Sequence, residues 1–219
     1  MVMILNIFKP RGCTSFHVVK NIRRIINDKK VGHGGTLDPF AEGVLIIGTG
    51  KDTKKLSNFI NDEKIYVAGL ELGIKTDTLD TEGKIIVEKT VPALTKDEIK
   101  TVLGSFLGES LQVPPMFSAK RINGQRLYKL ARRNIKIKRE PIKINIRDIE
   151  LIDYKENIIT FSVMCSKGTY IRVLGKDIAE KLNTVGYLKS LKRTNVGQFS
   201  IKDSIKMESF EAEWKSLET

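Results

Sequence analysis

The feature that most constrains the fold is a pair of long strand-like segments with very little chain between them. Residues 142–153 and 158–165 are both rich in apolar side chains that alternate with polar ones, as in half-buried strands. A connection this short joins antiparallel neighbours, because a parallel crossover needs a dozen or more residues. Other strand-like segments also have hairpin-like connections, and helix-like segments interleave with them. The sequence therefore predicts an α+β protein with a mixed, mostly antiparallel sheet.

Capping residues and apolar spacing predict the remaining elements. A helix is expected after Thr14 and Ser15, and another after the capping box of Thr95 and Glu98. Asn123-Gly124 is a strong hairpin signal. No repeat or linker interrupts the pattern, so residues 1–200 are expected to form one compact domain, followed by a short polar tail at 201–219. Further strands are predicted at 2–8, 44–47, 64–72 and 84–88, and further helices at 54–60, 125–133 and 171–182.

Basic residues are concentrated in one part of the chain. Lys and Arg outnumber Asp and Glu by 38 to 26, which gives a formal net charge of +12. Residues 111–147 contain 11 of the basic residues and a single acid, Glu140, so this segment alone carries +10. Such a segment is typical of proteins that bind nucleic acid or an anionic membrane surface, although a solvated lysine face gives the same pattern.

Several classes of protein are excluded by what the sequence lacks. Its only cysteines, Cys13 and Cys165, cannot form a disulfide framework, and its two cysteines and two histidines are too far apart in the sequence to predict a zinc site. Neither phosphate-binding glycine motif fits residues 43–53. No apolar run approaches the roughly 18 residues of a membrane-spanning helix. The sequence therefore predicts a cytoplasmic protein that spans no membrane and holds no metal or cofactor.

The stretch GHGGTLDP at 32–39, within a predicted loop at 28–43, is the most unusual in the sequence. Its glycines allow backbone geometries that other residues resist, and Pro39 holds Asp38 extended. The loop thus presents one carboxylate stiffly, with the imidazole of His33 five residues earlier. Asp38 is either a nucleophile or general base, or a cap for the segment that follows.

A second polar cluster, residues 166–172, lies between a predicted strand and a predicted helix. Its Arg172 either pairs with a buried carboxylate or lies exposed on the first helical turn. The acids from Asp77 to Glu82 lack the spacing of a calcium-binding loop and are expected on a solvated turn. Tyr66 lies in a predicted strand, and this position indicates only that its side chain is half-buried.

Taken together, these motifs resemble the TruB family of tRNA pseudouridine synthases over nearly the whole chain. The longest matching motif is VGHGGTLDPFAEG at 31–43, which is too specific for a chance match and supports a functional role for Asp38. Five shorter motifs complete the resemblance: KPRG at 9–12, KIYV at 64–67, GIKTDTLDTEG at 73–83, QVPPMFSAK at 112–120 and CSKGTYIR at 165–172.

The resemblance implies a fold, an activity and a site. The family converts the T-arm uridine of tRNA, position 55 in standard tRNA numbering, to pseudouridine without a cofactor, on an α+β catalytic domain with a long mixed sheet. Asp38 would be the catalytic aspartate, Tyr66 would stack on the target base, and Arg172 would pair with Asp38. The residues that would line the substrate pocket or belong to its motifs are Lys9, His33, Tyr170 and Leu191.

The resemblance also assigns the basic segment to a thumb, at about 114–141, that grips the T-loop. The partner would be the T-arm stem-loop of tRNA, bound by a monomer. Bacterial members usually carry a further C-terminal PUA-type domain, for which the residues after 200 are too few. The thumb residues expected to contact RNA are Lys120, Arg121, Arg126, Lys129, Arg132 and Arg133.

Two other functions remain open on the sequence. One is a pseudouridine synthase that acts on a different RNA, for example as the catalytic subunit of a guided complex. The other is a non-catalytic tRNA-binding protein on the same scaffold, against which the presence of Asp38, Tyr66 and Arg172 argues.

Overall fold

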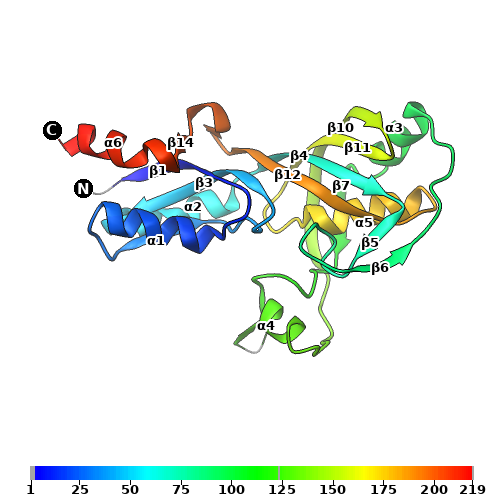
Figure 1. Cartoon of the computed structure of the whole chain (residues 1–219), viewed down its shortest axis with the longest axis horizontal. Helices are drawn as coiled ribbons and strands as arrows, with labels where there is room; N and C mark the ends of the chain where they lie inside the picture. Colours follow the sequence, from blue (N-terminus) through cyan, green and yellow to red (C-terminus); the bar gives the residue numbers. More distant parts are fainter. Residues whose placement is uncertain (1–2, 123, 219) are drawn as a thin grey trace. The chain divides into compact units, whose positions relative to one another are not determined.

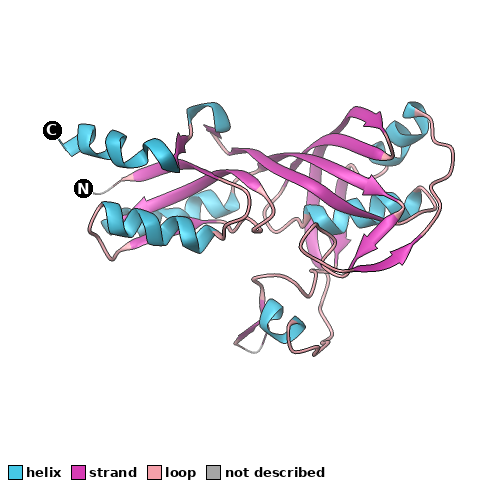
Figure 2. Cartoon of the chain, viewed as in Figure 1, coloured by secondary structure: helices cyan, strands magenta, loops and turns pink. Residues whose placement is uncertain are grey.

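The computed structural model describes residues 3–122 and 124–218 and divides the chain into two compact units (Figures 1 and 2). Unit 1 comprises Met1–Tyr66 and Leu191–Thr219, and unit 2 comprises Val67–Ser190. The chain passes from unit 1 to unit 2 within β4 (Lys64–Leu72) and returns within β12 (Gly186–Val196). Unit 1 is therefore assembled from two distant parts of the sequence, whereas unit 2 is continuous.

Unit 1 contains a mixed set of strands in the order β14-β1-β3-β12, with β2 beside β3 and β13 beside β12. β1 pairs with β3 antiparallel and with β14 parallel, and β12 pairs with β3 parallel. The strands are β1 (Ile4–Lys9), β2 (Val31–Gly34), β3 (Glu42–Thr49), β13 (Phe199–Ser200) and β14 (Ile205–Lys206). The helices are α1 (Ser15–Ile25), η1 (Gly50–Lys55), α2 (Leu56–Asn61), η2 (Ile201–Asp203) and α6 (Met207–Glu218).

Strand β3 is buried on both faces, which explains its continuous apolar run. Leu45 and Ile47 pack in a cluster with residues of β1, α1 and α6. Val44 and Ile46 face the other way and pack with Leu56 at the start of α2. A strand covered on both sides has no solvent face, so it shows no polar alternation. The short predicted strand at 44–47 is the centre of this longer element.

Unit 2 contains strands in the order β12-β4-β11-β10-β7, together with two short hairpins. β10 pairs antiparallel with β11 on one side and with β7 on the other, as the hairpin pattern predicts for β10 and β11. The α+β class with a mostly antiparallel mixed sheet is thus confirmed. The further strands are β5 (Ile74–Thr76), β6 (Ile85–Glu88), β7 (Gly108–Gln112), β8 (Arg121–Ile122), β9 (Gln125–Arg126), β10 (Ile142–Lys155) and β11 (Ile158–Cys165). The helices are α3 (Lys96–Gly104), α4 (Leu127–Ala131) and α5 (Ile171–Lys181).

Helix α5 packs closely against the strands because it carries a glycine at the contact. A Cβ atom added to Gly175 would lie 2.9 Å from the side chain of Leu188 on β12 and 3.3 Å from that of Leu70 on β4. A larger residue would push the helix away from the sheet. Gly175 therefore fixes the distance between the sheet and the first turn of α5, where Arg172 lies.

The clearest differences from the sequence prediction concern β12, β2 and the C-terminal tail. Strand β12 is missed because Lys189, Lys192 and Arg193 interrupt its apolar pattern. Strand β2 lies within the predicted loop 28–43. It is missed because glycines disfavour strands in general, whereas here they allow the close approach of Leu56. The predicted polar tail forms η2, β14 and α6, and α6 buries Phe210 and Trp214 in the core of unit 1.

Candidate active site

Asp38 lies in the connection between β2 and β3, residues 35–41, and its side chain is partly exposed. The backbone on both sides of Asp38 is held by residues from before and within α1. The N–H of Gly12 donates to the carbonyl of Pro39 at 2.8 Å. The hydroxyl of Ser15, which is 2% exposed, accepts from the N–H of Leu37 at 2.9 Å and donates to the carbonyl of Leu37 at 3.1 Å.

Lys9 holds the same loop with a buried ammonium group. Its side chain is 0% exposed. The Nζ atom donates to the carbonyl of Ala41 at 2.7 Å, to that of Pro10 at 2.9 Å and to that of Pro39 at 3.4 Å. Hydrogen bonds from a charged donor are about twice as strong as neutral ones. Lys9 therefore ties the end of β1 to the segment that follows Asp38.

Arg193 supports the loop from β12. Its side chain is 1% exposed, its Nε donates to the carbonyl of Val44 at 2.8 Å, and its Nη2 donates to the carbonyl of Gly35 at 3.2 Å. Gly43 is opposite Arg193 in the parallel register, and a Cβ atom there would lie 2.2 Å from the Arg193 carbonyl. Only glycine fits this position, which also has a φ of +115°. The β2–β3 connection is thus fixed at both ends.

Unit 1 also contains three of the predicted substrate-contacting residues. His33 lies on β2, opposite Ile47 of β3. Tyr66 on β4 is 9% exposed, and Leu191 on β12 is 6% exposed. The hydroxyl of Thr194 donates to the carbonyl of Ile65 at 3.3 Å, which links the parts of β12 and β4 that belong to this unit. The predicted site residues within unit 1 are therefore Lys9, His33, Asp38, Tyr66 and Leu191.

Arg172 is buried in unit 2 and is held by three groups. Its Nη1 donates to the carbonyl of Thr78 and its Nη2 to the carbonyl of Phe117, both at 2.7 Å. Its Nε lies 3.5 Å from Oδ2 of Asp80, and both side chains are less than 5% exposed. The prediction that Arg172 pairs with a buried carboxylate is confirmed for Asp80. Its predicted pairing with Asp38, which belongs to the other unit, stays a prediction.

The expectation of a solvated turn is correct for Asp77 and Glu82 and wrong for Asp80. Asp80 is 3% exposed, and its Oδ1 accepts from the hydroxyl of Thr78 at 2.5 Å and from the N–H of Glu82 at 2.9 Å. A buried carboxylate needs such donors and a cation to offset the loss of hydration. Arg172 supplies the cation, which the order of residues in the sequence does not reveal.

Tyr170 immediately precedes α5 and is positioned by Gln112 from β7. The N–H of Tyr170 donates to Oε1 of Gln112 at 2.8 Å, and Nε2 of Gln112 donates to the carbonyl of Tyr170 at 3.2 Å. Gln112 is 4% exposed. Helix α5 has no side-chain cap, so these two hydrogen bonds hold the backbone at its N-terminus. Sequence reasoning missed Gln112 as a positioning residue, although it opens the motif at 112–120.

The thumb, residues about 114–141, connects β7 to β10, and Figure 1 shows its helix α4 in a lobe outside the strands of unit 2. Leu127 and Leu130 are buried and anchor the lobe, and β8 pairs with β9 as predicted. Asn123 of the predicted hairpin turn lies outside the described residues. Among the described residues, no carboxylate forms an ion pair with the predicted RNA-contacting side chains of Lys120, Arg121, Arg126, Lys129, Arg132 and Arg133.

Strands β4 and β12 carry a further polar network within unit 2. The hydroxyl of Tyr187 donates to Oε2 of Glu71 at 2.7 Å, and Nζ of Lys189 lies 3.0 Å from the same oxygen. Burial raises the pKa of Tyr187 to about 12, and the hydrogen bond to Glu71 adds to that rise. Burial opposes ionisation of Glu71, but the hydrogen bonds from Tyr187 and Lys189 lower its pKa below the ordinary value.

The described residues lack two kinds of feature. They contain no group of three or more His, Cys, Asp or Glu side chains arranged to hold a metal ion. No helix in the described ranges is long and apolar enough to cross a membrane. Asp38 combines a carboxylate with a loop held by charged and neutral hydrogen bonds, as nucleophilic or general-base catalysis requires.

A family model for the N-terminal domain of TruB family pseudouridylate synthases matches residues 23–171. The chain belongs to the TruB family. Membership in this family makes it a pseudouridine synthase, which is an isomerase. The match includes Asp38, Tyr66 and the thumb.

Relatives in this family cover most of the chain. A tRNA pseudouridine synthase B from Clostridium kluyveri is 48% identical over 210 residues, which are 96% of this chain and 72% of that protein. One from Clostridium tetani is 46% identical over 210 residues, which are 96% and 73% of the two chains. One from Dehalococcoides mccartyi is 45% identical over 209 residues, which are 95% and 70%.

Solved structures support the fold. A chain from the crystal structure of a Cbf5-Nop10-Gar1 complex matches with a TM-score of 0.77 and 28% identity, over 98% of this chain and 55% of that one. A chain from an H/ACA RNP bound to a substrate RNA containing 2'-deoxyuridine matches with a TM-score of 0.72 and 26% identity, over 99% and 55%.

Proposed function

We propose that the chain isomerises the uridine at position 55 in the T-arm of tRNA to pseudouridine. The observation that carries this proposal is the immobilised loop that presents Asp38 in a chain of the TruB family. Relatives that are 45–48% identical over nearly the whole chain are named tRNA pseudouridine synthases, which supports tRNA as the substrate.

The reaction is an internal rearrangement of the nucleotide. The N1–C1′ bond breaks, the base turns, a C5–C1′ bond forms, the hydrogen at C5 leaves to solvent as a proton, and N1 takes up a proton in its place. Substrate and product contain the same atoms, so the balance requires no oxidant, reductant or phosphate donor. Asp38 supplies the carboxylate, which forms a covalent adduct with the nucleotide or takes a proton from the sugar.

The other two proposed catalytic residues prepare the base and the carboxylate. The target base lies in a folded loop and must be extruded before it reaches Asp38, and the ring of Tyr66 offers a face on which it stacks. Arg172 is held by two carbonyls and by Asp80, so its guanidinium is positioned before the RNA binds. We propose that it pairs with Asp38 in the assembled site and keeps the carboxylate oriented.

The thumb supplies affinity for the RNA backbone. Its predicted RNA-contacting side chains have no carboxylate partners among the described residues, so their charge is available to phosphates. Phosphate contacts position an RNA without reading its sequence. Recognition of the T-arm would then depend on the shape of the loop and on its unstacked bases.

Release of tritium from C5 of uridine tests the proposed reaction. A tRNA transcript labelled at C5 should release at most about one equivalent of label to water, with no added nucleotide, metal or reductant. A transcript in which the T-loop uridine is replaced by cytidine should release none, and a minimal T-arm stem-loop should still react. Release from the cytidine transcript would contradict the assignment to position 55.

A pseudouridine synthase for another RNA is the second candidate. The structural likeness to chains in the Cbf5-Nop10-Gar1 and H/ACA RNP structures favours it, because the second of these holds a substrate RNA. Release of label from other RNAs, but not from the T-arm stem-loop, would select this candidate. Binding of tRNA with no release from any RNA would instead indicate a non-catalytic tRNA-binding protein.

A further inference from the structure

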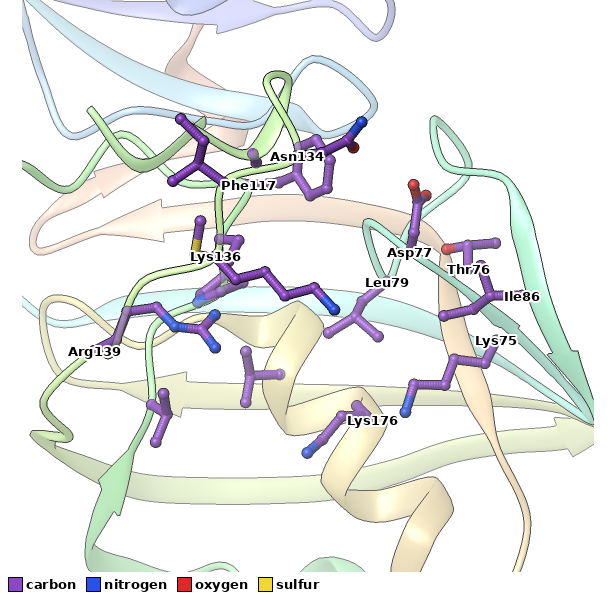
Figure 3. A pocket seen from close by; sticks show the side chains of 16 residues that line it. Lys75, Thr76, Asp77, Leu79, Ile86, Phe117, Asn134, Lys136, Arg139 and Lys176 are labelled. Atoms are coloured by element: carbon purple, nitrogen blue, oxygen red, sulfur yellow. The ribbon is translucent and has the colours of Figure 1, made fainter. Parts of the chain in front are cut away.

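A pocket of about 520 Å³ lies within unit 2, where the C-terminal part of the thumb faces β5, β6 and the first turns of α5 (Figure 3). Its volume is in the range of small-molecule sites. Every residue that lines it belongs to unit 2, whereas Asp38 belongs to unit 1. The pocket therefore contains no part of the loop that presents the catalytic aspartate.

The thumb side of the pocket carries two cations that lack acidic partners. Lys136 forms no ion pair within the described residues. Arg139 donates from Nη1 to the carbonyl of Pro114 at 3.2 Å, and its Nε is buried with no hydrogen-bond partner in the described chain. A buried N–H of a charged group without an acceptor is costly, so the site favours an incoming anionic oxygen.

The pocket cations of α5 and β5, unlike those of the thumb, have an acidic partner. Lys176 and Lys75 also line the pocket, but Glu180 lies 3.3 Å from the first and 3.6 Å from the second. Asp77 is the one acid among the lining residues. The uncompensated positive charge is therefore concentrated on the thumb side, at Lys136 and Arg139.

The rest of the lining is apolar and partly exposed. Ile86 is 56% exposed, Val113 is 43% exposed and Ile135 is 37% exposed, and all three line the pocket together with the ring of Phe117. Exposed apolar side chains next to unpaired cations match the two halves of a nucleotide, because a base stacks on apolar or aromatic surfaces and a phosphate binds cations.

The pocket shares its lining with the residues that hold Arg172. The two carbonyls that accept from Arg172 belong to Phe117, which lines the pocket, and to Thr78, which lies between Asp77 and Leu79. Val173, the next residue of α5, also lines it. A ligand in the pocket would thus contact the same segments that position Arg172.

We propose that this pocket binds one unpaired nucleotide of the RNA substrate, other than the uridine that is isomerised. Its phosphate binds Lys136 and Arg139, and its base packs against Phe117 and Ile135. The choice of RNA as the ligand rests on the proposed function. The target uridine is excluded because it must react with Asp38.

Paired changes in the protein and the RNA test this proposal. T-arm stem-loops with an abasic site at one loop position at a time are bound to the full chain carrying Asp38→Asn, so that no reaction occurs. One abasic position other than the target should weaken binding roughly tenfold, the effect of losing one base–aromatic stack. Adding Phe117→Ala should weaken binding of the intact RNA by a similar factor. In this variant the RNA with that abasic position should bind as tightly as the intact RNA, so the abasic penalty disappears.

Arg139→Ala tests the phosphate half, with Lys138→Ala as its matched control. Lys138 lies in the same segment, is 90% exposed, pairs with Glu140 at 3.5 Å and does not line the pocket. Both substitutions remove one positive charge, but Arg139→Ala should weaken RNA binding at least fivefold more. Equal losses of RNA affinity in the two variants would mean that only the overall positive charge of the thumb contributes to binding, and the proposal would be wrong.

A variant at an exposed position guards against misfolding of Phe117→Ala. Ile135→Ser changes a side chain that is 37% exposed, and it should also reduce the abasic penalty. An unchanged penalty at every loop position in both variants overturns the proposal. Conversion of the RNA by the chain with Asp38 intact is measured separately. If the RNA is converted but the pocket variants keep the abasic penalty, only the proposal for the pocket is rejected. If the variants lose the abasic penalty but no RNA is converted, only the proposed reaction is rejected.

Discussion

Arg172 and Asp80 form a buried ion pair in which Nε and Oδ2 are 3.5 Å apart. The geometry requires a planar group, because the same guanidinium also donates to the carbonyls of Thr78 and Phe117. A lysine at this position has one nitrogen and cannot reach all three acceptors in a plane. The pair joins the turn after β5, the start of the thumb and helix α5.

Replacing Asp80 by Asn should destabilise unit 2 by about 3–5 kcal/mol, because the Arg172 guanidinium would lose its buried counter-charge. Unfolding in urea, followed by circular dichroism, measures this loss. Arg172→Lys should lower turnover by about a hundredfold or more and should be less destabilising than Asp80→Asn. Near-normal turnover in the lysine variant would show that a point charge is sufficient.

Asp38→Asn keeps the shape of the side chain and removes the anionic carboxylate. Turnover should fall roughly a thousandfold or more, as when the sole covalent or general-base group is lost. RNA affinity should stay within about twofold, because we assign affinity to the thumb. Tritium release and filter binding on the same preparation measure the two quantities. Turnover within tenfold of the wild-type value would remove Asp38 from this role.

Tyr66→Phe and Tyr66→Leu separate stacking from proton transfer. The first substitution keeps the ring and loses the hydroxyl, and the second loses both. Tyr66→Leu should be nearly inactive, because no ring is left to stack on the base. We expect Tyr66→Phe to be impaired as well, since C5 must lose its proton late in the reaction. Full activity of the Phe variant, measured by single-turnover kinetics, would restrict Tyr66 to stacking.

Replacing Arg126, Arg132 and Arg133 together by Ala should weaken tRNA binding and flatten its dependence on salt. Each phosphate contact that is lost should lower the slope of log K against log salt by roughly one unit. Turnover at saturating tRNA should change less than affinity. A slope equal to that of the wild type would place these three arginines away from the RNA.

Tyr187→Phe should destabilise the chain by about 1–2 kcal/mol at pH 7, because Glu71 loses a hydrogen bond to its charged form. The pKa of Glu71 is lowered in the folded chain, so the stability it contributes is present above its ordinary value of 4.5 and is lost as the pH falls through the lowered value. The difference between variant and wild type should therefore shrink in acid. Urea unfolding at a series of pH values measures it, and a constant difference would contradict this account.

Local signals in the sequence predicted much of the fold. The capping box at Thr95 and Glu98 forms as expected at the start of α3. The side chain of Thr14 caps α1, and the strands at 142–153 and 158–165 pair. Each of these depends on residues that are close in the sequence. Short motifs also identified Lys9, Asp38 and Arg172 as candidate site residues.

The contacts of those residues could not be predicted in the same way. The supports of the Asp38 loop come from β1, α1 and β12, which are far apart in the sequence. Arg193 was missed because an arginine in a strand normally indicates an exposed edge, whereas this one is buried beneath the loop. Asp80 was assigned to a solvated turn because its cation lies 92 positions later in the chain.

The two-part composition of unit 1 has a consequence for the order in which the protein folds during synthesis. Unit 2 is continuous and can fold as soon as Ser190 has left the ribosome. Strand β1 pairs with β3 early in the sequence, but its second partner β14 follows almost 200 residues later, with Ile7 opposite Ile205. Closing such a long loop is slow. The loop of Asp38 is completed only after Arg193 has been synthesised, because this residue supports the loop and follows the whole of unit 2 in the sequence.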